Sequence, residues 1–478
     1  MCLINYTVFS FLDHYTVLLY FTILCITSLL NLFSKTMKFY LNKQIFTSIF
    51  IVIVGFITVC YFFKLYSSIN YWVNTYFFDS LSTAPLNAYS SFSDTLIFLS
   101  LITTVVSWIY LSERYLMHSL FNVFYFIIFI ICTILMTSTN DLFTMFLYFE
   151  FLFLPSLYYV YYLGYSKKVD ATVGFLLRWT FAGSLCVLMG LCYLYKLAST
   201  TTFDLVMLTF FGKFEFFLFF FCFFLGFSVK IPTWPFYYWL TKVHVEAPTG
   251  FSIFLSGFLV KTAFYCLTYF LLFFDNATYV CIALSICIWG SLDSSARMWT
   301  STDIKRLIAF ATIQEMNLIL IFFFFFNSNY VSILNCFLLV HGVLSTYLFF
   351  LIDQVQKQTT SRNLLNLSGM SVIVPFIALF VWISLLVYRG FPIFIKFIIE
   401  WELLNSLVFN FGLLGFLFFF VISFFGVLGF ARIWFTILYG SPMNFFARDF
   451  LRRDFVVATY LVTTLTILNL FLITNLEI

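Results

Sequence analysis

The sequence predicts an all-α polytopic membrane protein with about fourteen transmembrane helices. Of its 478 residues, 63 % are hydrophobic and only 9 % are charged, and the mean hydropathy is +1.04. A soluble domain carries about 25 % charged residues, so this composition excludes a soluble enzyme, and it equally excludes a disordered chain. The apolar stretches are continuous rather than alternating, which argues against a transmembrane β-barrel. The net charge of +4 is too small to indicate a nucleic-acid partner.

Apolar stretches bounded by charges or turn residues mark the expected membrane spans. In chain order they are residues 8–30, 45–66, 95–112, 120–138, 141–163, 172–195, 214–241, 250–272, 277–296, 304–326, 331–353, 371–409, 411–438 and 455–475. Two spans are interrupted, one by Pro232 and Pro235 and the other at 389–393, where the sequence begins Arg-Gly-Phe-Pro. Proline removes a backbone donor and clashes with the preceding turn. Paired interrupted helices in the two halves of a chain point to a transport site.

The basic residues test this layout independently through the positive-inside rule. When loops are numbered by the helices they join, the odd-numbered loops contain 15 Lys and Arg residues and the even-numbered loops contain 3. The other six of the 24 basic residues lie at membrane depth. A helix miscounted midway would remove this asymmetry. The pattern therefore predicts fourteen spans, with both termini on the side away from the cytoplasm or matrix.

Cysteine usage argues against a metal or cluster site, and codon bias indicates which kind of genome encodes the chain. None of the eleven cysteines forms a C-x-x-C pair, and almost all lie in apolar runs. We therefore expect small buried hydrophobes rather than an iron–sulfur or zinc site. The 74 Phe and 30 Tyr residues indicate T-rich codons, which are typical of an organellar genome. The first residues lack an Arg-rich amphipathic presequence, so we expect the gene to reside in the organelle itself.

Ionisable residues inside the spans are the informative positions, because a charge at mid-bilayer costs at least ~2.5–3.5 kcal/mol. Glu150 and Lys261 have apolar neighbours for about two turns or more in both directions, and Lys230 directly precedes the first break. We interpret these three residues as functional. The other candidates at membrane depth or at its edge are His244, Glu246, Glu315, His341, Lys396 and Glu400.

Three of these candidates have a plainer alternative. A lone buried histidine usually bonds a backbone carbonyl, and this alternative stays open for His341. His244 and Glu246 follow the first break in a short link, where they could simply cap a turn at the membrane edge.

The chemistry that this set of side chains supports is proton transfer. Burial lowers the pKa of a lysine and a neighbouring carboxylate raises it again, so a buried lysine with a movable glutamate partner can exchange a proton near neutral pH. A row of Glu, Lys, His, Lys and Glu over several helices would form a relay along the membrane plane. Metal binding is a poor alternative, because no pair of His, Cys or acidic residues has ligand spacing.

Several motifs resemble one known family. The stretch GFSVKIPTWPFYYWLTKVHVEAPTGFSIFLSGFLVKTAFY at 226–265 resembles the core of the antiporter-like subunits of respiratory complex I, and its HVEAP link resembles the subunit 4 branch rather than subunits 2 or 5. Further segments are similar to signatures of that family: FDSLSTAPL, DLFTMFLYFEFLFLP, STDIKRLIAFATIQEMN, HGVLSTYLF and GFPIFIKFIIEWELL. The matches run from about residue 79 to 402, roughly two-thirds of the chain.

The resemblance implies a fold and residue roles. It implies two inverted five-helix repeats at 120–272 and 273–438, with broken helices at 230–235 and 389–393. Three helices in 1–119 would precede them and one helix in 439–478 would follow. The implied roles are a first half-channel pair of Glu150 and Lys230, a central lysine at Lys261, an eleventh-helix histidine at His341 and a terminal acidic residue at Glu400.

Three positions depart from the family pattern. Glu315 stands where relatives often carry a tenth-helix histidine, Lys396 stands where asparagine is usual, and Ile399 stands where glycine is usual. Lys396 and Glu400 are four residues apart, so they share a helix face and can form an ion pair. We predict that Lys396 lies within reach of Glu400 or of Glu315, which would compensate for the change.

The sequence therefore predicts a proton-translocating membrane subunit of NADH:ubiquinone oxidoreductase in the mitochondrial inner membrane. We expect no flavin, cluster, quinone or metal in this chain; FMN, iron–sulfur clusters and ubiquinone would belong to other subunits. The expected partners are other membrane-arm subunits, including neighbouring antiporter-like subunits, and membrane lipid. Two alternatives remain, a subunit of a multi-subunit sodium/proton antiporter and a membrane scaffold that has lost pumping.

Overall fold

The computed structural model describes residues 84–476 apart from short gaps at 115–118, 165–167, 208, 210, 271–276, 326–330, 360, 365–366, 442–448 and 450–451. The expected spans 8–30 and 45–66 lie outside the described residues. Within the described ranges the chain is helical, and extended backbone pairs only in two isolated bridges. A helical membrane protein is therefore confirmed, whereas the total of fourteen spans and the inverted repeats stay predictions.

The first half of the described chain consists of long helices interrupted once by an unwound segment. Its elements are α3 (Ala84–Arg114), α4 (Ser119–Ser138), α5 (Leu142–Leu163), α6 (Val169–Ala198), the short α7 (Phe203–Met207), α8 (Lys213–Lys230), α9 (Tyr238–Glu246), α10 (Thr249–Phe254), the π-helical turn η2 (Leu255–Leu259) and α11 (Val260–Phe270). The span expected at 214–241 is thus broken into α8 and α9, as its two prolines predict.

The second half repeats this pattern of long helices with one break. Its elements are α12 (Ala277–Thr300), α13 (Ile304–Phe325), α14 (Val331–Thr359), α15 (Met370–Ile373), α16 (Pro375–Tyr388), α17 (Ile395–Phe411), α18 (Leu413–Leu438) and α19 (Arg452–Leu476). The span expected at 371–409 is broken between α16 and α17. The breaks therefore occur at both predicted places.

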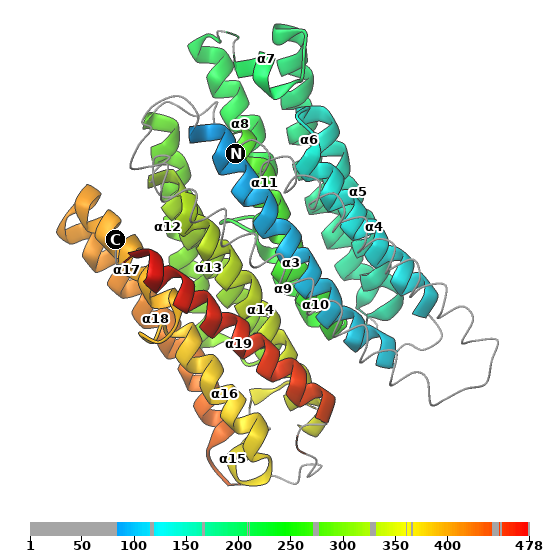
Figure 1. Ribbon diagram of the computed structural model, residues 1–478, viewed down its shortest axis with the longest axis vertical. Coiled ribbons are helices and arrows are strands. Elements are labelled where there is room, and N and C mark those ends of the chain that lie inside the picture. Colours follow the sequence, from blue (N-terminus) through cyan, green and yellow to red (C-terminus); the bar gives the residue numbers. More distant parts are fainter. Residues whose placement is uncertain are drawn as a thin grey trace, which may run out of the picture.

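The helices stand roughly side by side in an elongated bundle (Figure 1). Helices α4, α5 and α6 lie along one side, α16, α17 and α18 lie along the other, and α3 and α14 run between them. Among the described residues, seven helices are long and apolar enough to cross a membrane: Leu142–Leu163, Val169–Ala198, Thr249–Phe270, Thr278–Thr300, Ile304–Phe324, Ile333–Thr359 and Leu413–Leu438. The central ones, α10–α11, α13 and α14, are the most completely buried.

Hydrogen bonds from side chains and backbone of the protein itself satisfy the carbonyl groups that are freed at the first break. Pro232 cannot donate a backbone hydrogen bond, so α8 ends before it. The carbonyl of Ser228 accepts from the backbone N of Thr233 at 3.0 Å and from its hydroxyl at 3.1 Å. The carbonyl of Val229 accepts from the indole N–H of Trp239 at 2.8 Å. These bonds replace the missing helical ones, which is the condition for unwound backbone at membrane depth.

Small residues bring the central helices unusually close. On η2, a Cβ at Gly257 would lie 2.6 Å from the methyl groups of Thr103 on α3 and Thr346 on α14. On α14, a Cβ at Gly342 would lie 3.2 Å from the carbonyl oxygen of Gly257. Close approach through small residues is a common way for membrane helices to associate. This contact holds α14 against the segment that leads into Lys261.

Candidate functional site

Glu150 and Lys230 form a direct ion pair in the first half of the chain. Glu150 lies in the middle of α5, and Lys230 is the last residue of α8 before the break. The ammonium group donates to a carboxylate oxygen of Glu150 and lies 4.2 Å and 4.6 Å from the ring centroids of Phe149 and Phe153. The predicted pairing is confirmed. The break brings this lysine to the end of a helix, where its carboxylate partner and two aromatic faces surround it.

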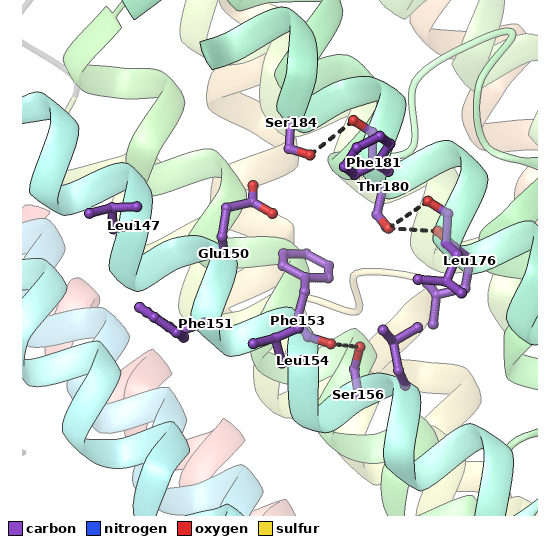
Figure 2. A pocket seen from close by; sticks show the side chains of 12 residues that line it. Leu147, Glu150, Phe151, Phe153, Leu154, Ser156, Leu176, Thr180, Phe181 and Ser184 are labelled. Carbon is purple, nitrogen blue, oxygen red and sulfur yellow. Dashed lines mark hydrogen bonds between the residues drawn. The ribbon is translucent and has the colours of Figure 1, made fainter.

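The two partners of this pair differ in access. The Lys230 side chain is completely buried, whereas 30 % of the Glu150 side chain is exposed. Glu150 lines a cavity of about 200 Å³ between α5 and α6, and Figure 2 shows its carboxylate on the same side of α5 as the facing Thr180 and Ser184. Both hydroxyls already donate to carbonyls of their own helix. Glu150 is therefore the accessible member of the pair, whereas Lys230 is enclosed within the bundle.

Lys261 lies at the centre of the bundle, directly after the π-helical turn. Its ammonium group is fully buried and donates to the backbone carbonyl of Ser256 in that turn. A π-helical turn widens the helix by one residue and is frequent at functional sites. Here it places a backbone carbonyl beside the lysine, and within the described residues no carboxylate pairs directly with Lys261.

Two buried histidines lie near this central lysine. His244 on α9 is fully buried and stacks on Phe349, with the ring centroids 4.8 Å apart. His341 on α14 is also buried, and neither ring nitrogen of either histidine has a hydrogen-bond partner among the described residues. The plainer interpretation of His341, a bond to a backbone carbonyl, is therefore wrong. The charge of Lys261 acts electrostatically on both rings.

Glu246 takes a different position from His244. It is the last residue of α9 and lines a cavity of about 470 Å³ together with Lys168, Lys242, Asp303 and Arg306. It is partly exposed. The structure thus separates the two residues of the link, with His244 inside the bundle and Glu246 at its edge.

In the second half, Lys396 joins two carboxylates. Its ammonium nitrogen lies 2.6 Å from a carboxylate oxygen of Glu315 on α13 and 3.4 Å from one of Glu400 on the next turn of α17. It also donates to the carbonyl of Tyr388 at 2.7 Å, which is the last residue of α16. The prediction that Lys396 reaches at least one of these acids is confirmed for both. The lysine does not extend to lipid or to an interfacial loop, because only 2 % of its side chain is exposed.

Charge interactions connect several of the site residues inside the bundle. The charges of Lys230 and Glu150 both act on the Cys266 thiol of α11. Lys261, five residues earlier on the same helix, feels Glu315. His341 feels Lys261 and Lys396 at once. Charge interactions therefore connect Lys261, His341 and the charged groups at the second break, whereas Glu150 and Lys230 interact with each other and with Cys266 on the helix that carries Lys261.

The structure also buries charges that lie near the ends of the expected spans. Lys305 is completely buried and donates to the carbonyl of Ala247 at 2.8 Å. Asp353 is completely buried, accepts from the hydroxyl of Thr249 at 2.7 Å, and pairs with Lys357 at 3.2 Å. Charges near the ends of spans look like loop residues in a sequence, but the link after α9 is drawn into the bundle and these side chains hold it there. The i, i+4 spacing of Asp353 and Lys357 is the one sequence signal that indicates the pair.

Within the described ranges, no group of three or more His, Cys, Asp or Glu side chains converges in the way that metal ligands do. The arrangement instead offers titratable groups that alternate acid and base over several helices.

A protein-family profile described as "NADH:quinone oxidoreductase/Mrp antiporter, TM" matches residues 139–426. The chain belongs to this family. The matched range contains every candidate site residue from Glu150 to Glu400. The matched range therefore includes both helix breaks and both ion-paired lysines.

Curated members of the family resemble the chain over most of its length. It is 34 % identical to "NADH-ubiquinone oxidoreductase chain 4" of Paramecium tetraurelia over 86 % of this chain and 88 % of that protein. It is 30 % identical to the protein of the same name from Acanthamoeba castellanii over 66 % of this chain and 63 % of that protein. It is 28 % identical to "NADH-quinone oxidoreductase subunit M" of Rickettsia prowazekii over 55 % of this chain and 56 % of that protein.

Solved structures share the fold. A chain of respiratory complex I from Thermus thermophilus superposes with a TM-score of 0.66 at 19 % identity, over 80 % of each chain. A chain of the Mrp complex from Dietzia sp. gives 0.66 at 16 % identity, over 84 % of this chain and 81 % of that one. A chain of an archaeal membrane-bound sulfane sulfur reductase gives 0.75 at 15 % identity, over 94 % and 93 %. At these identities the likeness shows the antiporter-like membrane fold alone.

Proposed function

We propose that this chain is the proton-translocating membrane subunit of an NADH:ubiquinone oxidoreductase. The observation that carries the proposal is the Glu150–Lys230 ion pair at a helix break. A second charged cluster, Glu315 with Lys396 and Glu400, lies at the other break, and the charge of Glu315 acts on the central Lys261. Family membership and the chain 4 names of its relatives support the same function.

Each relay residue has a role that its surroundings permit. Glu150 exchanges protons with the cavity between α5 and α6 and with its partner Lys230. Lys261 carries the proton at the centre, because only a backbone carbonyl holds its ammonium group. His341 lies between the charges of Lys261 and the second break, and Glu400 is the terminal acid. Moving one charge against a membrane potential of 100 mV takes about 2.3 kcal/mol. Rearrangement of a single buried ion pair supplies a free energy of this size and is therefore a sufficient driving step.

The proposal includes the setting of the chain. It resides in the mitochondrial inner membrane with both termini on the intermembrane-space side, as the distribution of basic residues predicts. It contacts other membrane-arm subunits, including neighbouring antiporter-like subunits, and lipid. It holds no redox cofactor; FMN, iron–sulfur clusters and ubiquinone belong to other subunits. The two inverted repeats are supported by a glutamate–lysine pair at each break, Glu150 with Lys230 and Glu315 with Lys396.

The test is a Lys261→Met variant of the complex in sealed vesicles. Methionine keeps the volume of the side chain but cannot carry a proton. Because a positioned proton-transfer group typically contributes at least about 10²-fold in rate, proton translocation coupled to NADH oxidation should fall strongly while the complex still assembles. Lys242→Met, which changes an exposed lysine on α9, is the control and should pump normally. Normal pumping in Lys261→Met would contradict the proposal.

The same assay separates the alternatives. A sodium/proton antiporter subunit is compatible with the family profile, which includes Mrp antiporters, and it would show sodium-dependent proton flux without NADH. A scaffold subunit would leave pumping unchanged in every relay variant. The intact Glu150–Lys230 and Glu315–Lys396 pairs argue against a scaffold, because buried charges that have lost their use are expensive to keep.

A further inference from the structure

We propose that Glu315, Lys396 and Glu400 together hold one exchangeable proton at the far end of the relay. This inference rests on the proposed function, and it assigns a task to a cluster that combines two departures from the family pattern. We define these three residues as the triad.

The charge count of the triad carries the argument. It contains two carboxylates and one ammonium group, and the exposed fractions of the side chains are 6 %, 24 % and 2 % for Glu315, Glu400 and Lys396. With both carboxylates ionised the triad would have a net charge of −1. An uncompensated charge is costly inside the protein, and within the described residues no second basic side chain pairs with either acid. One proton on the two carboxylates makes the triad neutral.

The lysine itself is not the carrier of this proton. An ammonium group has three donors, and those of Lys396 face Glu315 at 2.6 Å, the Tyr388 carbonyl at 2.7 Å and Glu400 at 3.4 Å. Its nitrogen also lies 4.2 Å from the ring centroid of Tyr388. Lys396 is therefore a fixed cation, and the mobile proton resides on the carboxylates on either side of it.

The backbone at the break leaves room for the second carboxylate. Gly390 has a φ of +65°, and a Cβ there would lie 2.7 Å from a carboxylate oxygen of Glu400. Only glycine satisfies both the left-handed backbone and this close approach. Glu400 is thereby brought beside Lys396 instead of being displaced towards the surface of α17.

The groups around the triad connect it to the rest of the relay. The Tyr388 hydroxyl donates to the side-chain oxygen of Gln314 at 3.0 Å, so it is already engaged. On α14, His341 feels the charge of Lys396. On α11, Lys261 feels the charge of Glu315. The charge state of the triad therefore acts on the central lysine. Glu150 and Lys230, by contrast, form a neutral one-to-one pair that needs no additional proton.

Infrared spectroscopy of the purified complex tests the proposal through the carbonyl band of protonated carboxylic acids. Glu315→Gln and Glu400→Gln each leave one carboxylate to balance Lys396, so each variant should lose the intensity of one protonated carboxyl. Lys396→Asn leaves two buried carboxylates without a cation, so it should gain intensity. Glu150→Gln is the control, because Glu150 is already balanced by Lys230 and its loss should leave the band unchanged. A purely structural triad does not predict opposite signs for the acid and lysine variants.

An unchanged band in either glutamine variant would overturn the proposal, and so would a loss of intensity in Lys396→Asn. The three variants address the same site independently. If one of them fails to assemble, the other two still decide the outcome. This result is separate from the proposed function, which fails only if Lys261→Met pumps normally. Pumping that depends on Lys261 together with an unchanged carboxyl band would leave the relay in place and remove the stored proton.

Discussion

Besides Lys305, which lies near the end of a span, three lysines lie buried in the described bundle, and each of the three is balanced in a different way. Lys230 has one carboxylate, Glu150, and two aromatic faces. Lys396 has two carboxylates. Lys261 has only the carbonyl of Ser256 as a direct partner. Because a buried ammonium group needs compensation, the central lysine is the one whose charge is held least firmly, which suits a residue that must give its proton up.

The Glu150–Lys230 pair yields a prediction that separates stability from transport. Lys230→Met leaves a partly buried carboxylate without its cation, and breaking such a pair costs about 3 kcal/mol or somewhat less here, because Glu150 is part exposed. The double variant Glu150→Gln with Lys230→Met removes both charges and should recover most of that stability. Pumping should be lost in both. Thermal unfolding of the purified complex and vesicle acidification measure the two effects, and a double variant as unstable as the single one would contradict the pairing.

How far the sequence predicts such residues depends on their position in a span. Glu150, Lys230 and Lys261 stand out in the sequence because a charge among apolar neighbours at membrane depth is costly. Lys305 and Asp353 are missed, because a charge near the end of a span looks the same whether it faces water or a buried link. Partners distant in sequence, such as Glu315 for Lys396, follow from the repeat that the resemblance implies and not from spacing.

At the scale of elements, proline marks the breaks but does not show what closes them. Pro232 and the segment at 389–393 predict both interruptions, and the structure has both. The bonds from Thr233 and Trp239 that satisfy the first break need the tertiary fold. The π-helical turn at Leu255–Leu259 has no proline, so the sequence contains no signal for it. Most helix ends are predicted within about four residues, because charges and turn residues bound the apolar runs. The largest differences are at α3, which begins at Ala84 instead of 95, and at α14, which ends at Thr359 instead of 353.

The second break can be tested at Gly390. Gly390→Ala places a Cβ in a left-handed conformation, which costs about 1–2 kcal/mol, and also pushes it against Glu400. Gly412→Ala is the matched control, because Gly412 has a φ of +58° and no atom within 4 Å of the added Cβ. Both variants should lower thermal stability, but only Gly390→Ala should reduce pumping. Equal pumping in the two would show that the approach of Glu400 to this backbone does not matter.

At the scale of the whole molecule, two halves meet along α3, η2 and α14. Each half contributes a broken helix and a glutamate–lysine pair, and the central lysine and His341 lie where the halves join. The sequence predicts the halves from the two breaks, and it predicts the orientation of the chain from its basic residues. It does not predict that two glycines, Gly257 and Gly342, permit the close contact between the halves, since a glycine inside an apolar helix has no distinctive neighbours.

Gly257 is the position where this junction can be loosened without touching a charge. Gly257→Ala would force its Cβ against the methyl groups of Thr103 and Thr346, both 2.6 Å away, and overpacking of this kind costs about 1–3 kcal/mol. Because α14 must move to relieve it, the spacing between Lys261 and His341 should change. The protons translocated per NADH should fall in sealed vesicles, while NADH oxidation continues.

The control for this change is Gly174→Ala on α6, where the added Cβ meets only an arginine nitrogen at 3.8 Å. That substitution should be neutral or slightly stabilising, by roughly 0.5–1 kcal/mol, because alanine is the better helix former. The comparison isolates the junction, since both variants add one methyl group to a membrane helix. If Gly257→Ala translocates as many protons per NADH as Gly174→Ala, the distance between the two halves does not govern transfer through the central lysine, and the relay must tolerate displacement of α14.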